Sequence, residues 1–244
     1  MDACLFRRMA EVEDCHWWFR GRRRVVARAL EALALPAGAT ILDLGCGTGG
    51  NLSMLARFGR LAACEADDGA REMAVARQVV PVEPGALPDQ LSYPPSSFDV
   101  VVMTDVLEHV EHDRPALGSV ARLLAPGGRL VLTVPALPWL WTARDEAHHH
   151  FRRYTKTSLA AALDAGGLAI ERLAYYNTLL FPAVVGQRLL ARAGGRPYED
   201  DLGLPPRWIN RLLEETMAAE WPLVRRGLTP IGASLIAVAR REQG

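Results

Sequence analysis

Apolar and polar positions alternate along the chain in blocks that predict strands and helices in turn. Residues 41–44 and 98–103 are almost continuously apolar, which is typical of parallel strands buried on both faces of a sheet. Helical spacing of apolar residues separates most of the predicted strands. The pattern therefore predicts an α/β fold around a mostly parallel sheet. Further strands are expected at 60–68, 129–134, 168–175 and 232–239, with a weaker one in the proline-rich stretch 80–96.

These strands divide the chain into a sheet domain and two additions. Residues 1–35 are expected to form an N-terminal flap and helix, and residues 36–175 with 232–244 the sheet domain. About 55 residues separate the last two predicted strands, far more than the hairpin that normally joins such strands. The segment 176–231 is therefore expected to be a helical insertion.

The stretch Ile41–Asn51 (ILDLGCGTGGN) joins a predicted strand to a predicted helix through a glycine-rich turn. Gly45, Gly47 and Gly50 satisfy the spacing G-x-G-x-x-G, in which glycines let the backbone approach a ligand at the helix N-terminus. This spacing fits dinucleotides and other adenosine ligands alike. Asp43 distinguishes the two kinds of ligand. A carboxylate before the turn repels the pyrophosphate of a dinucleotide, but it suits a ligand with positive charge beside its adenosine.

S-adenosylmethionine is such a ligand, with a sulfonium and an ammonium group. With Asp43 ahead of G-x-G-x-G, the stretch resembles the first motif of the class I S-adenosylmethionine-dependent methyltransferases. The resemblance implies a Rossmann-like, doubly wound, seven-stranded mostly parallel sheet and S-adenosyl-L-methionine as the cofactor. Two other classes are kept open: a nicotinamide-dependent oxidoreductase, which Asp43 disfavours, and a non-catalytic protein that binds the cofactor as a partner.

Positions after the turn are expected to hold the rest of the cofactor. Glu65 lies twenty residues after Gly45, where a carboxylate can accept hydrogen bonds from both ribose hydroxyls, and Asp67 would replace it if the strand ran further. In the proline-rich stretch only a backbone contact near Leu87 is expected, because the acid that family members often carry there is missing. The predicted cofactor set is Trp18, Phe19, Arg22, Asp43, Gly45, Cys46, Gly47, Gly49, Asn51, Glu65, Ala66, Leu87, Thr104, Asp105 and His109.

Aromatic side chains crowd at residues 16–19, just before a helix predicted from Gly21 onward. One interpretation is an aromatic anchor packed on the domain, with a solvated basic face. The other is a flap over the cofactor, in which Arg22 or Arg23 meets the methionine carboxylate and an aromatic ring covers the sulfonium. The run H-W-W-F-x-x-R is similar to the entry helix of bacterial methyltransferases often associated with polyprenyl-linked sugars or other lipidic acceptors, which favours the flap.

The strand 98–103 is followed by the run D-x-x-E-H, made of Asp105, Glu108 and His109. It is similar to the E-x-x-E-H metal-binding run of ubiquinone-pathway O-methyltransferases, with Asp in place of the first Glu. Two carboxylates and an imidazole can hold a divalent metal ion, which the shorter aspartate disfavours here. Three roles are therefore open for His109: a histidine that faces the cofactor, a ligand in a metal site, or a general base.

The segment after the strand 129–134 is rich in polar side chains. Since α/β sheets bind ligands at the carboxyl ends of their strands, His150 or His148 is expected to bind the acceptor or remove its proton. The alternative is a structural network around Arg152 and Tyr154. An oxygen acceptor needs deprotonation, for which His109, His150 or a bound metal are the candidates. No D/N-P-P-Y/F run, the usual mark of methyl transfer to amino groups of bases, follows the fourth strand.

The amino-acid composition of the chain restricts the kinds of molecule that it is expected to bind. The 244 residues carry 28 basic and 28 acidic side chains, so a bulk nucleic-acid binder is not expected. Four cysteines without C-x-x-C spacing, and no signal peptide, indicate reduced thiols and a cytoplasmic location. The helical stretch 207–221 would be roughly 22 Å long, too short for a ~30 Å hydrocarbon core.

The acceptor is expected to be a small amphiphilic or lipid-linked molecule, because the flap is basic and the insertion is apolar. The insertion is predicted to serve as a lid, a homodimer contact or an acceptor-binding element. Membrane contact, if any, is expected to be peripheral, since the charges of this helical stretch are mixed rather than basic.

Overall fold

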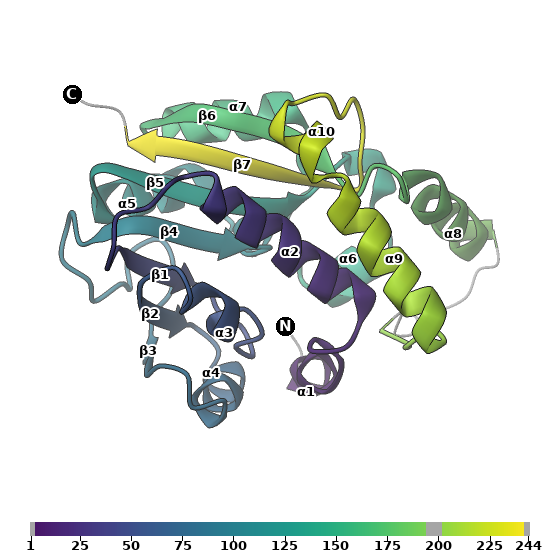
Figure 1. Cartoon of the computed structure of the whole chain (residues 1–244), viewed down its shortest axis with the longest axis horizontal. Helices are drawn as coiled ribbons and strands as arrows, with labels where there is room; N and C mark the ends of the chain where they lie inside the picture. Colours follow the sequence, from purple (N-terminus) through teal and green to yellow (C-terminus); the bar gives the residue numbers. More distant parts are fainter. Residues whose placement is uncertain (1–2, 194–201, 242–244) are drawn as a thin grey trace.

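Seven strands form one mixed sheet in the computed structural model, which describes residues 3–193 and 202–241 (Figure 1). Along the sheet they lie in the order β3-β2-β1-β4-β5-β7-β6. β7 runs antiparallel to β5 and β6, and the other neighbouring pairs are parallel. The predicted α/β class with a seven-stranded, mostly parallel, doubly wound sheet is confirmed. The strands are β1 (Thr40–Leu44), β2 (Arg60–Glu65), β3 (Val82–Pro84), β4 (Phe98–Thr104), β5 (Leu124–Pro135), β6 (Leu168–Tyr176) and β7 (Ser234–Arg241).

Side chains of β4 alternate between two layers of helices. Val100 and Val102 pack in the core with α2, α3, α9 and α10, whereas Val101 and Met103 pack in the core with α5 and α7. Burial on both faces explains why the central strands read as continuous apolar runs. The helices are α1 (Ala3–Val12), α2 (Trp17–Glu31), α3 (Leu52–Leu55), α4 (Asp68–Ala76), α5 (Asp113–Leu123), α6 (Ala143–Ala147), α7 (Lys156–Ala165), α8 (Phe181–Ala193), α9 (Arg207–Ala219) and α10 (Trp221–Arg225), with 3₁₀ turns η1 (Leu107–His109) and η2 (Pro138–Leu140).

The N-terminal segment contains two helices, and α2 starts earlier than the helical spacing predicted. It begins at Trp17 rather than Gly21, so the aromatic run forms its first turn. The His16 imidazole accepts a hydrogen bond from the Trp18 amide at 3.2 Å and caps the helix, a role that histidine seldom takes. In Figure 1, α2 and α9 lie side by side across the sheet. They approach closely at Gly21, where an added Cβ would meet the Met217 sulfur.

Between β6 and β7 the described residues form α8, α9 and α10. Residues 194–201 of the predicted insertion lie outside the described residues, as do 1–2 and 242–244 of the other predicted segments. The fully buried Glu220 carboxylate accepts hydrogen bonds from the Thr178 and Leu179 amides, both at 2.8 Å, and so ties the insertion to the end of β6. Across the described ranges, none of the helices is both long and apolar enough to cross a bilayer.

Candidate cofactor and acceptor site

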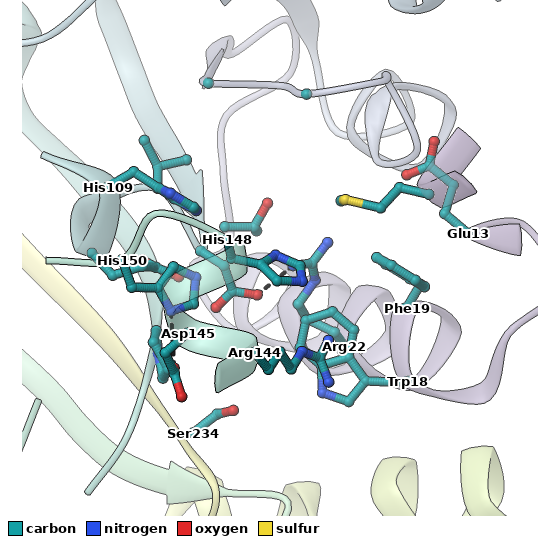
Figure 2. A pocket seen from close by; sticks show the side chains of 18 of the residues that line it. Glu13, Trp18, Phe19, Arg22, His109, Arg144, Asp145, His148, His150 and Ser234 are labelled. Atoms are coloured by element: carbon teal, nitrogen blue, oxygen red, sulfur yellow. Dashed lines mark hydrogen bonds and ion pairs between the residues drawn. The ribbon is translucent and has the colours of Figure 1, made fainter. Parts of the chain in front are cut away.

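A cavity of about 1560 Å³ lies at the carboxyl ends of β1, β2 and β4. The strand order reverses between β1 and β4, and open α/β sheets bind ligands at such a switch point. Pockets for one drug-sized ligand measure about 300–1,000 Å³, so this cavity has room for two ligands. Figure 2 shows Trp18 and Phe19 of α2 facing a group of histidines across the cavity.

Most of the residues predicted for the site line this cavity. Two predicted cofactor residues, Asp43 and Gly49, do not. The predicted residues in its wall are Trp18, Phe19, Arg22, Gly45, Cys46, Gly47, Asn51, Glu65, Ala66, Leu87, Thr104, Asp105, His109, His148 and His150.

Glu65 is held in place by the backbone around it. Its Oε2 accepts a hydrogen bond from the Gly47 amide at 2.7 Å, and its Oε1 accepts from the Ala66 and Asp67 amides at 2.9 and 3.0 Å. Asp67, the fallback for the ribose, accepts a hydrogen bond from the Ala70 amide and caps α4. Glu65 therefore presents a fixed carboxylate at the end of β2, with a lone pair on Oε2 left for a ligand.

Asp43 lies near the end of β1, just before the glycine turn, and does not line the cavity, so its role toward the cofactor stays a prediction. Its side chain is fully buried, and neither carboxylate oxygen has a hydrogen-bond partner among the described residues. Burial raises the pKa of Asp43 to about 7, although the nearby charge of Arg22 opposes the rise. Asp43 is therefore a buried carboxyl beside the turn that is not part of the cavity wall.

Gly49 is the second predicted residue that faces away from the cavity. Its φ of 86° lies in the left-handed region, and an added Cβ would sit 2.8 Å from the Arg77 side chain and 3.1 Å from the Ala74 backbone. This glycine therefore serves the packing of the turn against α4. Asn51 does face the cavity, and its amide donates to the Thr104 hydroxyl at 2.8 Å, joining the turn to the end of β4.

Arg22 connects the N-terminal flap to the end of β4. Its buried guanidinium forms an ion pair with the Asp105 carboxylate and lies 4.7 Å from the centre of the Trp18 ring. Burial lowers the pKa of Arg22, but the charges of Asp105 and Tyr176 and the hydrogen bond to Asp105 together outweigh burial and raise the pKa. Asp105 has a left-handed φ of 55° and accepts a hydrogen bond from the Thr133 hydroxyl at 3.1 Å. Arg23, the alternative to Arg22, is not part of the cavity wall.

Glu13 is a cavity residue that sequence reasoning missed. It is buried, and its carboxylate accepts hydrogen bonds from the Thr48 hydroxyl of the glycine turn and from Arg77 of α4, the latter at 2.6 Å. An added Cβ at Gly50 would meet the same carboxylate. No motif indicates Glu13, because its role depends on how the N-terminal segment folds back onto the turn.

The D-x-x-E-H run does not gather as a three-residue cluster. Asp105 forms an ion pair with Arg22. Among the described residues, the side chains whose possible metal-ligand atoms lie within 4.8 Å of one another are Glu108, His109 and His150. Burial, with the charge of Asp105, raises the pKa of Glu108 well above its usual range, and its Oε2 has no hydrogen-bond partner among the described residues. These three side chains can offer a carboxylate and two imidazoles to a divalent ion.

Asp145 is the centre of a buried polar network in the segment after β5. Its Oδ1 accepts from Arg153 Nε at 2.7 Å and lies 3.0 Å from His150 Nδ1. Its Oδ2 accepts from the Thr142 amide at 2.9 Å and lies 3.4 Å from Arg188 Nη1. Burial raises the pKa of Asp145, but the His150 hydrogen bond and the Arg153 charge hold it well below its ordinary value. The network predicted around Arg152 and Tyr154 is a separate one, in which the Tyr154 hydroxyl donates to Asp113 at 3.0 Å and Arg152 pairs with Asp113 at 3.1 Å.

Two further histidines of the cavity wall, His148 and His109, have lowered pKa values. Burial, followed by the charge of Arg144, lowers the pKa of His148 to about 3. Burial, followed by His150, lowers the pKa of His109 to about 4. His109 and His150 pack edge to face with ring centres 4.7 Å apart. Two further wall residues, Asn177 and Ser234, were not predicted, because only the pairing of β6 with β7 brings them to the cavity.

Known proteins that resemble this chain are methyltransferases. A family described as a methyltransferase domain matches residues 18–173. A ubiquinone biosynthesis O-methyltransferase of Xanthomonas euvesicatoria pv. vesicatoria (strain 85-10) is 31% identical over 156 residues, which cover 55% of this chain and 64% of that protein. A trans-aconitate 2-methyltransferase of Azoarcus sp. (strain BH72) is 29% identical over 77% of this chain and 73% of that protein. A demethylmenaquinone methyltransferase of Tropheryma whipplei (strain Twist) is 30% identical over 66% and 65% of the two chains.

Solved structures share the fold at low sequence identity. A putative sarcosine dimethylglycine methyltransferase from Galdieria sulphuraria aligns with a TM-score of 0.63 at 15% identity, over 91% of this chain and 85% of that one. Geranyl diphosphate C-methyltransferase from Streptomyces coelicolor A3(2), solved with S-adenosyl-L-homocysteine, aligns with a TM-score of 0.59 at 16% identity, over 88% and 78%. The matched methyltransferase domain, together with the strand order and the glycine turn, shows that this chain belongs to the class I S-adenosylmethionine-dependent methyltransferase family.

Proposed function

We propose that the protein transfers the methyl group of S-adenosyl-L-methionine to an oxygen of a small amphiphilic or lipid-linked acceptor. The observation that carries the proposal is one cavity with two chemically different parts. One part combines the glycine turn with Glu65 and the Arg22–Asp105 pair, which suits an adenosine attached to an amino acid. The other part combines histidines with the Asp145 network, which suits recognition and deprotonation of an acceptor.

In the cofactor part, Glu65 accepts hydrogen bonds from the ribose hydroxyls, because its carboxylate is already oriented by three backbone amides. Arg22 binds the methionine carboxylate, and Asp105 attracts the ammonium. The amino acid part of the cofactor carries a carboxylate and an ammonium group, one for each partner of this ion pair. Arg22 and Asp105 can therefore separate on binding, and both side chains keep a partner of opposite charge. Trp18 stacks on Arg22 and keeps the guanidinium in place.

In the acceptor part, apolar side chains lie at the edge of the cavity beside the polar network. Leu190 of α8 is 75% exposed and Phe151 is 51% exposed, and both belong to the cavity wall. Apolar residues that are open to solvent and to the cavity at once suit a molecule with a polar head and an apolar tail. The spare volume beyond the cofactor supports an acceptor of substantial size.

The protein has two chemical tasks: to align the acceptor with the methyl group, and to remove one proton from the acceptor. When bound, S-adenosylmethionine supplies an electrophilic methyl group and a thioether leaving group. Holding the acceptor oxygen in line with that methyl group can be worth an effective molarity of about 10⁵ M or more. A hydroxyl acceptor must also lose its proton, and His150, His109 and His148 of the cavity wall are the candidate bases. This scheme needs no metal ion.

A labelled-methyl assay tests the proposal. The protein would be incubated with methyl-labelled S-adenosylmethionine and one of three acceptors: an ortho-dihydroxybenzene with an apolar tail, a demethylmenaquinone analogue, and trans-aconitate, each with and without EDTA. We expect label on the oxygen of the dihydroxybenzene, unchanged by EDTA. Label on carbon, or on trans-aconitate alone, would contradict the acceptor class. Cofactor binding without transfer to any acceptor would favour the non-catalytic alternative.

A further inference from the structure

We infer that Asp145 is a positioning residue that fixes the tautomer of His150, so that His150 presents an unprotonated Nε2 to the cavity as the proton acceptor for methyl transfer. The inference rests on the proposed function and adds one residue and one atom to it. Neither the tautomer nor the role of Asp145 follows from the D-x-x-E-H run or from the cofactor motif.

The contacts of Asp145 leave its carboxylate ionised and therefore able only to accept hydrogen bonds. It is fully buried, with the Arg153 guanidinium 2.7 Å from Oδ1 and the Thr142 amide 2.9 Å from Oδ2. Arg188 adds a second guanidinium to the same carboxylate. A buried carboxylate with two cationic partners and a backbone donor stays charged, because neutralising it would leave the guanidinium groups uncompensated.

An acceptor-only carboxylate decides which ring nitrogen of His150 carries the hydrogen. Since His150 Nδ1 lies 3.0 Å from Asp145 Oδ1, Nδ1 must donate. In a neutral imidazole the other nitrogen, Nε2, then has a free lone pair. The orientation of the ring is fixed as well, because the His150 amide donates to the Asp145 carbonyl at 2.9 Å and the ring packs against His109.

The position of His150 suits proton removal. It belongs to the cavity wall, and Figure 2 shows it beside Asp145 and His109, across the cavity from Trp18 and Phe19. In the proposed step the acceptor oxygen forms a bond to the methyl carbon with one of its lone pairs. The methyl–sulfur bond breaks with its electrons going to sulfur, and the hydroxyl proton passes to His150 Nε2. Asp145 remains ionised and stabilises the imidazolium that forms.

The test is the tautomer of His150 in the complex with S-adenosylhomocysteine. Long-range ¹H–¹⁵N spectra of protein labelled at histidine distinguish Nδ1–H from Nε2–H rings. His150→Gln identifies the signal by its loss, and His149→Asn, an exposed neighbour with a left-handed φ of 55°, is the matched control. We expect the Nδ1–H form for His150. In Asp145→Asn we expect a shift toward the Nε2–H form that water favours, with unchanged affinity for S-adenosylhomocysteine.

An Nε2–H ring in the wild-type complex would overturn the inference, and so would the same tautomer in Asp145→Asn as in the wild type. If Asp145→Asn fails to fold, as loss of S-adenosylhomocysteine binding would reveal, the wild-type tautomer alone decides. Failure of the wild-type protein to bind S-adenosylhomocysteine would instead count against the proposed function. The two failures are therefore distinguishable.

Discussion

At the scale of single residues, Asp43 shows a conflict between stability and binding. Below pH 7 the buried carboxyl is largely protonated in the folded protein, since burial raises its pKa to about 7. The unfolded chain releases this proton near pH ~3.9. The folded state therefore binds the additional proton between these values, and the free energy of unfolding falls as the pH rises through this window. Above it the full cost of a buried charge is present.

Asp43→Asn should therefore raise the melting temperature at about pH 8 and leave it almost unchanged near pH ~4. The same change should weaken binding of S-adenosylmethionine, whose positive charges favour the ionised form of Asp43. Wild-type affinity should rise as the pH increases through 7, while the affinity of the variant stays flat. Calorimetric melting and binding curves at several pH values check both statements. A variant that melts lower at about pH 8 would contradict the unpaired, buried state of this carboxylate.

Arg22 offers a second test at this scale. Arg22→Met should weaken binding of S-adenosylhomocysteine by about tenfold or more, because one charge-assisted bond to the methionine carboxylate is lost. Binding of methylthioadenosine, which lacks the amino acid, should be unchanged. Isothermal titration of both ligands measures the difference. Arg28→Met, an exposed arginine on the same helix, is the matched control. Equal losses for both ligands would place Arg22 elsewhere than at the carboxylate.

At the scale of elements, the insertion is fastened to the sheet through Glu220. Its carboxylate satisfies the amides of Thr178 and Leu179, which begin the connection from β6 to α8. Glu220→Ala would remove both charge-assisted hydrogen bonds and should cost about 3 kcal/mol in the free energy of unfolding. Glu72→Ala, an exposed glutamate on α4, should leave the unfolding midpoint unchanged. Equal midpoints for the two variants in urea would contradict this attachment.

Helices α8 and α9 carry the apolar surface that the lipid-linked proposal requires. Leu190 is 75% exposed, and Trp208 and Leu212 on α9 are 70% and 57% exposed. We expect the protein to sediment with vesicles that contain anionic lipid, and the double variant Leu190→Asp, Trp208→Asp to sediment less while retaining affinity for S-adenosylhomocysteine. Equal sedimentation of the two proteins would argue against membrane contact through these helices and favour a lid or dimer contact.

The elements also show what the sequence could and could not predict. Strands such as β1 and β4 were predictable because burial on both faces leaves continuous apolar runs. The start of α2 at Trp17 was not, since a histidine cap and aromatic residues in the first turn hide it. Among site residues, Glu65 was predictable from its register after the glycine turn. Glu13 and Asn177 were not, because folding of distant segments alone brings them to the cavity.

At the scale of the whole molecule, the N-terminal helices and the insertion meet over the cavity. Val12, Phe19 and Leu202 form a small apolar cluster that joins α1, α2 and the start of the segment before α9. Phe19 and Leu202 also belong to the cavity wall. The sheet therefore supplies the floor of the site, and two segments far apart in the sequence supply its cover. Polar groups enclosed in this way interact more strongly than they would in open water.

The central claim is that this cavity binds S-adenosylmethionine through Glu65 and the glycine turn. Isothermal titration of S-adenosylhomocysteine and of NADH into the wild-type protein and Glu65→Gln tests it most directly. The proposal predicts one S-adenosylhomocysteine bound per chain, no binding of NADH, and about tenfold weaker binding in Glu65→Gln, which loses charge-assisted bonds to the ribose. Binding of NADH without S-adenosylhomocysteine, or full affinity in Glu65→Gln, would contradict it.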